Sequence, residues 1–198
     1  MCKESSIFNK SYWKSAADEL KDVKIIAFAA LILALNIVMQ GFFVPVGESL
    51  RVYFTFIIKG IGCMVFGPVV ALCYGFIGDI LGYIMFPTGG FFPGYTISSM
   101  LGVFIYALFF YKSKITVMRI FLAKLTVNVF VNIILGSVWS AILYSKGYYY
   151  YFAKSIIKNL TLLPFEVILM VIVFQIMIPI IKRSGIIKND GFVKIPFI

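Results

Sequence analysis

A series of polar side chains interrupts an apolar stretch in the second half of the chain. Its members recur at intervals of three or four residues and are Lys124, Asn128, Asn132, Gly136, Trp139 and Ser140. Residues at this spacing lie on one face of a helix. Amide groups hydrogen-bond heteroaromatic rings, and tryptophan can stack on them. The series therefore indicates either a binding face for a flat ligand or hydrogen bonds between neighbouring helices.

Two charges lie inside other apolar stretches, Lys59 and Asp79. Charged groups in hydrocarbon are rare and are candidates for function or for pairing. Counted from the Gly67-Pro68 break, Asp79 lies about 4.5 Å farther along the helix axis than Lys59, at 1.5 Å per residue. A lysine side chain can span that distance, so we predict a structural Lys59–Asp79 charge pair.

A further carboxylate, Glu166, follows Lys158 in the last apolar stretch. It could pair with Lys158 or accept hydrogen bonds from the N–H groups of a ligand. Aromatic side chains flank the turn that follows the third apolar stretch and could cover a flat ligand there: Phe86, Phe91, Phe92 and Tyr95.

The composition restricts the class of protein. The chain has 198 residues, of which 62% are hydrophobic and 13% charged, and its mean hydropathy is +1.00. A soluble domain is usually about half apolar, and continuous apolar runs favour helices over the alternating strands of a barrel. We predict an all-α integral membrane protein. The absence of histidine excludes Ser-His hydrolases, His-ligated zinc proteases and histidine proton relays. We assign no catalytic residue, metal or cofactor.

We predict a bundle of six transmembrane helices within residues 23–183, between cytoplasmic tails at residues 1–22 and 184–198. The expected spans are residues 25–44, 52–66, 69–86, 97–111, 115–144 and 160–181. Gly67-Pro68 permits only a tight reversal between the second span and the third. The first tail contains a helical pattern around Trp13, which indicates a helix on the membrane surface or a solvated tail.

The distribution of lysine and arginine predicts the orientation. With six spans, both termini lie on one side, and that side carries most of the basic residues. Because basic residues are enriched in cytoplasmic loops, we expect both termini inside and the loops at residues 45–50, 87–96 and 145–159 outside. Arg119 and Lys124 begin the fifth span, where they can extend to the near surface. The same distribution explains the net charge of +10 without nucleic acid.

Several motifs in residues 51–111 resemble the S component of energy-coupling-factor (ECF) vitamin transporters, and within that group the folate family. They are the Arg-x-x-Phe opening at Arg51, FGPVV, GDILGY, FPTGGFFPG and YTISS. The run KNLTLLPFE, which ends at Glu166, is similar to another pattern of the family. Two positions depart from it: Lys59 replaces an apolar or small residue, and Ser155 stands where an arginine is frequent.

The resemblance implies a six-helix S component that captures a vitamin, with folate as the first choice and another vitamin or precursor as the alternative. An intramembrane enzyme is a distant alternative, because Asp79 and Glu166 are a poor catalytic pair. The resemblance implies ligand contacts for a set of outer residues: Arg51, Phe92, Tyr95, Asn128, Asn132, Trp139, Lys158 and Glu166.

The resemblance also implies protein partners. Ala30 and Ala34 lie one turn apart in the first span and match the alanine motif that docks onto a shared transmembrane subunit. Their spacing alone is equally compatible with packing inside the bundle. The chain contains no P-loop, so two partner ATPases would supply the energy.

Overall fold

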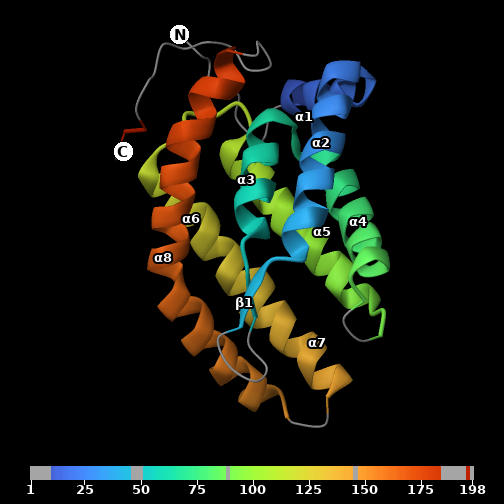
Figure 1. Ribbon diagram of the computed structural model, residues 1–198, viewed down its shortest axis with the longest axis vertical. Helices are drawn as coiled ribbons and strands as arrows, with labels where there is room; N and C mark the ends of the chain where they lie inside the picture. Colours follow the sequence, from blue (N-terminus) through green and yellow to red (C-terminus); the bar gives the residue numbers. More distant parts are fainter. Residues whose placement is uncertain (1–9, 46–50, 88–89, 145–146, 184–194, 197–198) are drawn as a thin grey trace.

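The computed structural model describes residues 10–45, 51–87, 90–144, 147–183 and 195–196, with side chains outside this description at residues 11, 43–45 and 51–52. The described part is almost entirely helical (Figure 1). In chain order its helices are α1 (Lys10–Asp18), η1 (Glu19–Lys21), α2 (Val23–Gln40), α3 (Thr55–Val65), α4 (Pro68–Met85), α5 (Pro93–Phe110), α6 (Val117–Thr126), η2 (Val127–Leu135), α7 (Gly136–Leu143) and α8 (Tyr148–Arg183).

Five of the described helical segments are long and apolar enough to cross a membrane. They are residues 23–40, 68–85, 93–110, 117–143 and 148–183. The predicted second span is the exception, because α3 has only 11 residues, or about 16 Å at 1.5 Å per residue. The expectation of an all-α membrane protein is thus met, and the described residues contain five full-length candidate spans, with α3 as a shorter apolar helix.

A small hairpin explains why α3 is short. Strands β1 (Phe43–Pro45) and β2 (Arg51–Tyr53) pair antiparallel, with Val44 opposite Val52. The residues at the start of the predicted second span therefore form a strand, whose backbone groups are satisfied by β1. The hairpin lies beyond α3, toward the end of the bundle opposite α1 (Figure 1).

The fifth predicted span is a continuous run of α6, η2 and α7. Its central segment η2 is a π-helix of nine residues. π-helical turns are rare and are frequent at functional sites. The polar series read from the sequence passes through this segment.

Helix α8 begins earlier than predicted. The expected outer loop at residues 145–159 is wrong from Tyr148 onward, because those residues form the first turns of a 36-residue helix. Pro164 lies within this helix. The first turns of α8 extend beyond the β1–β2 hairpin (Figure 1), and Tyr149 in them is 85% exposed.

Helices α2 and α4 approach each other closely through glycines. Gly78 lies against Leu33 and Asn36 of α2, and the side chain of Gln40 rests directly on Gly82. Small residues allow membrane helices to pack at short distance. Asn36, only 1% exposed, is thus directed at α4.

The N-terminal helix packs on the bundle. Tyr12 and Ala16 of α1 are buried with Tyr111 at the end of α5. The carboxylate of Glu19 accepts hydrogen bonds from the Gly67 backbone N–H, at 2.7 Å, and from the Tyr111 hydroxyl. A merely solvated tail would not make these contacts. The sequence analysis did not predict this docking, and the helix on the membrane surface stays a prediction.

Candidate functional site

A buried ion pair lies between the fifth predicted span and the last. Lys124 Nζ of α6 is 3.1 Å from Glu166 Oε1 of α8, and the two side chains are 3% and 14% exposed. The same ammonium group lies 4.0 Å from the ring centroid of Phe56 on α3, within the range of a cation–π interaction. Three helices thus meet at one charge.

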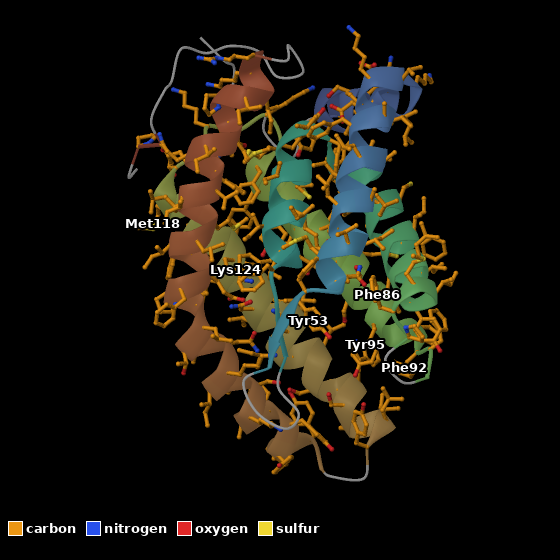
Figure 2. All side chains as sticks on the ribbon, viewed as in Figure 1. Tyr53, Phe86, Phe92, Tyr95, Met118 and Lys124 are labelled. Atoms are coloured by element: carbon orange, nitrogen blue, oxygen red, sulfur yellow. The ribbon has the colours of Figure 1, made fainter. Side chains whose placement is uncertain are left out.

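This position corrects the sequence interpretation of Lys124. Instead of extending to the near surface, it points into the bundle, at about the middle of its height between α6 and α8 (Figure 2). A snorkelling lysine keeps its ammonium in water. Here the carboxylate and the aromatic ring replace that water.

A hydrogen-bond chain continues from the ion pair toward the end of the bundle that carries the hairpin. Asn128 Nδ2 donates to Glu166 Oε2 at 3.2 Å and, more weakly, to the backbone carbonyl of Asn159 at 3.5 Å. Asn132 Nδ2 donates to Asn128 Oδ1 at 2.8 Å. Asn128 is 2% exposed, whereas Asn132 is exposed. The series of hydrogen bonds therefore leads from the buried charge of Glu166 to the accessible amide group of Asn132.

The π-helical turn keeps the polar series on one face. In an α-helix, four residues turn about 40° past a full circle, so residues at intervals of four drift around the axis. A π-helix has i→i+5 hydrogen bonds and more residues per turn, so an interval of four falls short of a full turn there and offsets the drift in the flanking α-helical turns. Asn128 and Asn132 both lie in η2, and their side chains are in hydrogen-bond contact.

Of the four predicted outer aromatics, Phe92 and Tyr95 lie beside Trp139, whereas Phe91 packs on Tyr83 and Phe86 lies against Gly41. Phe92 makes edge contacts with Trp139 and Tyr95 at centroid distances of 5.6 and 5.9 Å. Gly94 lies beneath Phe92 and Trp139, where an added Cβ would come within 2.7 Å of the indole. Phe92 and Tyr95 lie on the hairpin side of the bundle's middle (Figure 2). The indole N–H of Trp139 donates to Ser98 Oγ at 2.9 Å, so the ring face is what remains for a ligand.

Asp79 and Lys59 do not form a direct ion pair. Within the described residues, no contact of 4.0 Å or less joins their charged atoms, and Asp79 Oδ2 accepts a hydrogen bond from Thr96 at 2.7 Å. The structural role predicted for this pair stays a prediction, and Thr96 is a partner that sequence reasoning missed.

The two cations expected at the outer side, Arg51 and Lys158, lie on different elements. Arg51 pairs with Pro45 through the hairpin backbone, and its side chain lies outside the described part. Lys158 lies on α8, two turns before Glu166, and is partly buried. The direct partner of Glu166 is Lys124, not Lys158. The four-residue interval from Lys124 to Asn128 was the signal that could have identified it.

The predicted docking alanines lie on an open face. Ala30 and Ala34 are both exposed, and α2 is the least buried of the five candidate spans. Across the described ranges, no group of three or more histidine, cysteine, aspartate or glutamate side chains is arranged to hold a metal ion.

Comparison with known proteins identifies the family to which the chain is similar. The family model described as "ECF transporter, substrate-specific component" matches residues 24–182. A folate transporter FolT of Clostridium novyi is 34% identical over 149 residues, which cover 75% of this chain and 87% of that protein. A folate transporter FolT of Leuconostoc mesenteroides is 28% identical over 153 residues, covering 74% and 82%.

A solved structure is also similar. The crystal structure of FolT bound with folic acid superimposes with a TM-score of 0.69 at 32% sequence identity, covering 75% of this chain and 91% of that chain. The resemblance read from the sequence motifs is thus confirmed.

Proposed function

Because this chain belongs to the family of ECF transporter substrate-specific components, we propose that it is the membrane subunit that captures folate or a reduced folate for an ATP-driven importer. One observation carries this proposal. The hydrogen-bonded polar residues from Lys124 to Asn132 lie beside the aromatic group around Trp139, in a protein related to folate transporters. The family is one of transport components, and we assign this chain no covalent chemistry.

The ligand's ring would lie against Asn132 and the face of Trp139. These residues are seven apart, or about 10 Å along the helix. Trp139 already donates its N–H to Ser98, so it would contact the ring by stacking. Phe92 and Tyr95 would cover the ring from the turn before α5. Asn128 and Glu166 lie behind Asn132 and complete the polar wall.

The anionic tail of folate would require a cation. Arg51 at the end of the hairpin and Lys158 on α8 are the residues we assign to it, with Lys154 close in sequence to replace the arginine absent at Ser155. Lys59 and Asp79 would stabilise the bundle rather than contact the ligand.

The partners would be a transmembrane coupling subunit and two ATPase subunits. Ala30 and Ala34 on the open face of α2 are suited to helix docking, because small side chains let another helix approach closely. In this arrangement α3 completes a six-helix bundle, with both termini cytoplasmic and the hairpin end outside. The excess of lysine and arginine at the α1 end supports this orientation.

Titration calorimetry of the purified protein in detergent tests the ligand. We expect tight binding of folic acid or a reduced folate, and none of thiamine, riboflavin or biotin. Asn132→Ala should weaken folate binding by about 1–2 kcal/mol, the contribution of one hydrogen bond, with an unchanged melting temperature. Tight binding of one of the other vitamins, with no heat from any pterin, would show that this S component carries a different cargo.

A further inference from the structure

The hydrogen-bond chain that ends at Asn132 has a direction. Glu166 is an ionised partner of Lys124, and a carboxylate only accepts hydrogen bonds. The amide group of Asn128 that faces it must therefore be the NH2 group. The orientation of an asparagine amide is otherwise ambiguous, but here the charge of Glu166 decides it.

That orientation determines the orientation of the next amide. The NH2 group of Asn128 is directed at α8, where it donates to Glu166 and to the Asn159 carbonyl. Its own carbonyl is left for Asn132, whose NH2 group donates to it at 2.8 Å. The exposed Asn132 side chain is thus anchored through its nitrogen. No hydrogen bond to its carbonyl oxygen is found in the described part of the chain.

We propose that Lys124 and Glu166 are positioning residues that lock Asn132 with its carbonyl oxygen toward the ligand, so that the site selects a ring carrying an N–H donor at that edge. This rests on the proposed function, and it names which ring edge the site accepts. An amide free to rotate could offer either its oxygen or its nitrogen. A locked amide presents its oxygen at one fixed position, and the second N–H of its NH2 group is fixed beside the bond to Asn128.

Folic acid and its 4-amino analogue differ at such an edge. The 4-oxo ring of folic acid has an N–H group between C2 and C4, next to a carbonyl oxygen. The 4-amino analogue has a bare ring nitrogen there, next to an NH2 group, so donor and acceptor are exchanged. The locked Asn132 matches the first edge and opposes a bare nitrogen with its own oxygen. Once a bound ring covers Asn132, a polar group left unpaired in this way discriminates strongly between the two ligands.

The first experiment measures selectivity by titration with both ligands. We expect the wild-type protein to bind folic acid about tenfold or more tightly than the 4-amino analogue. Glu166→Gln keeps the shape but can present either oxygen or nitrogen to Asn128, so the amides are released. The ratio of the two dissociation constants should then fall below about threefold, because a released amide can turn either its oxygen or its nitrogen toward the ligand.

The ratio separates positioning from general damage. A variant that only loosens the site weakens both ligands equally and leaves the ratio unchanged, which would overturn the proposal. Thr126→Val is the matched control, because within the described ranges the Thr126 hydroxyl donates only to the Leu122 carbonyl of its own helix, at 2.7 Å. It should alter neither affinity nor ratio.

The second experiment needs no ligand, so it tests the lock even if folate does not bind. In protein labelled with 15N-asparagine, Glu166→Gln should shift the side-chain NH2 signals of both Asn128 and Asn132. The signal of Asn36, which lies on α2 against Gly78 of α4, should stay in place. A shift confined to Asn128 would show that polarity is not transmitted and would overturn the lock. Absent binding with both signals shifted would refute the folate assignment and retain the lock.

Discussion

Glu166 and Glu19 are two carboxylates removed from water, and they are compensated in different ways. Glu166, in the middle of the bundle, has the ammonium of Lys124 at 3.1 Å. Glu19, next to the first span, accepts hydrogen bonds from Gly67 and Tyr111 and has no ion-pair partner within 4.0 Å among the described residues. The charge of Glu166 is compensated by an opposite charge, whereas Glu19 is compensated by hydrogen bonds from neutral donors.

The difference follows from depth. In hydrocarbon an unpaired carboxylate is very unfavourable, so Glu166 needs a full countercharge. Glu19 sits at the N-terminus of α4, where Gly67 caps the helix and the helix dipole favours an anion. Burial nevertheless raises the pKa of Glu19 above its usual range, against the opposing effect of its hydrogen bonds and of Lys112. The core carboxylate thus has a countercharge, whereas the peripheral one has neutral donors and a raised pKa.

Removing the countercharge should have the largest effect. Lys124→Met leaves Glu166 unpaired in the bundle, and we expect a loss of about 3–5 kcal/mol in the free energy of unfolding. Chemical denaturation in detergent measures it. The double variant Lys124→Met/Glu166→Leu removes both charges and should recover most of this loss. If the double variant were as unstable as the single one, packing rather than charge would explain the effect.

Crowding the second carboxylate should have an intermediate effect. A Cβ at Gly67 would lie 3.0 Å from the Ala16 Cβ and 3.1 Å from Glu19 Oε2. Gly67→Val should therefore displace α1, at about 1–3 kcal/mol, and raise amide hydrogen exchange in residues 12–21. Gly102→Ala is the control, since its nearest neighbour would be Val127 Cγ1 at 4.0 Å. Unchanged protection of α1 in Gly67→Val would contradict this contact.

The pH response of Glu19 should be smaller. Because its pKa is higher in the docked state than in a free helix, protonation favours docking. Docking is then strongest below the ordinary glutamate pKa and weakens as the pH rises through the raised value. Glu19→Gln should flatten this dependence. Trp13, which stacks on Phe104, reports docking by fluorescence in a Trp139→Phe background.

The ionisation of Tyr12 sets the upper pH limit for the fluorescence experiment on Glu19. Burial, together with the charge of Glu19, raises the pKa of Tyr12 to about 12. Its ionisation therefore falls well above the Glu19 window. A Trp13 signal equally pH-dependent in wild type and Glu19→Gln would assign the response to another group.

The smallest effect on the isolated protein should come from a surface that touches neither carboxylate. Ala34→Trp adds bulk to the exposed face of α2, so we expect unchanged folate affinity and an unchanged melting temperature. The same variant should fail to co-purify with the transmembrane coupling subunit, because docking requires close helix approach. Lost ligand binding with an intact complex would place the docking surface elsewhere.

The sequence by itself determined what depends on each stretch alone. Apolar runs in the chain predict membrane helices, because a backbone in lipid must satisfy its own hydrogen bonds. The Gly67-Pro68 reversal, the polar face through Asn128 and Asn132, and the family itself were also readable from local patterns. The hairpin and the early start of α8 were not, since strand pairing and helix length beyond the membrane depend on neighbours.

Only the tertiary structure decided which polar groups meet. Glu166 was assigned to nearby Lys158 or a ligand, yet its countercharge comes from Lys124 on another helix. Glu19 drew no prediction, although it anchors α1 to the α3–α4 turn. Such pairs depend on how each helix is rotated and how closely it approaches its neighbours. Those quantities are set by packing across the bundle, and residue spacing along one helix does not contain them.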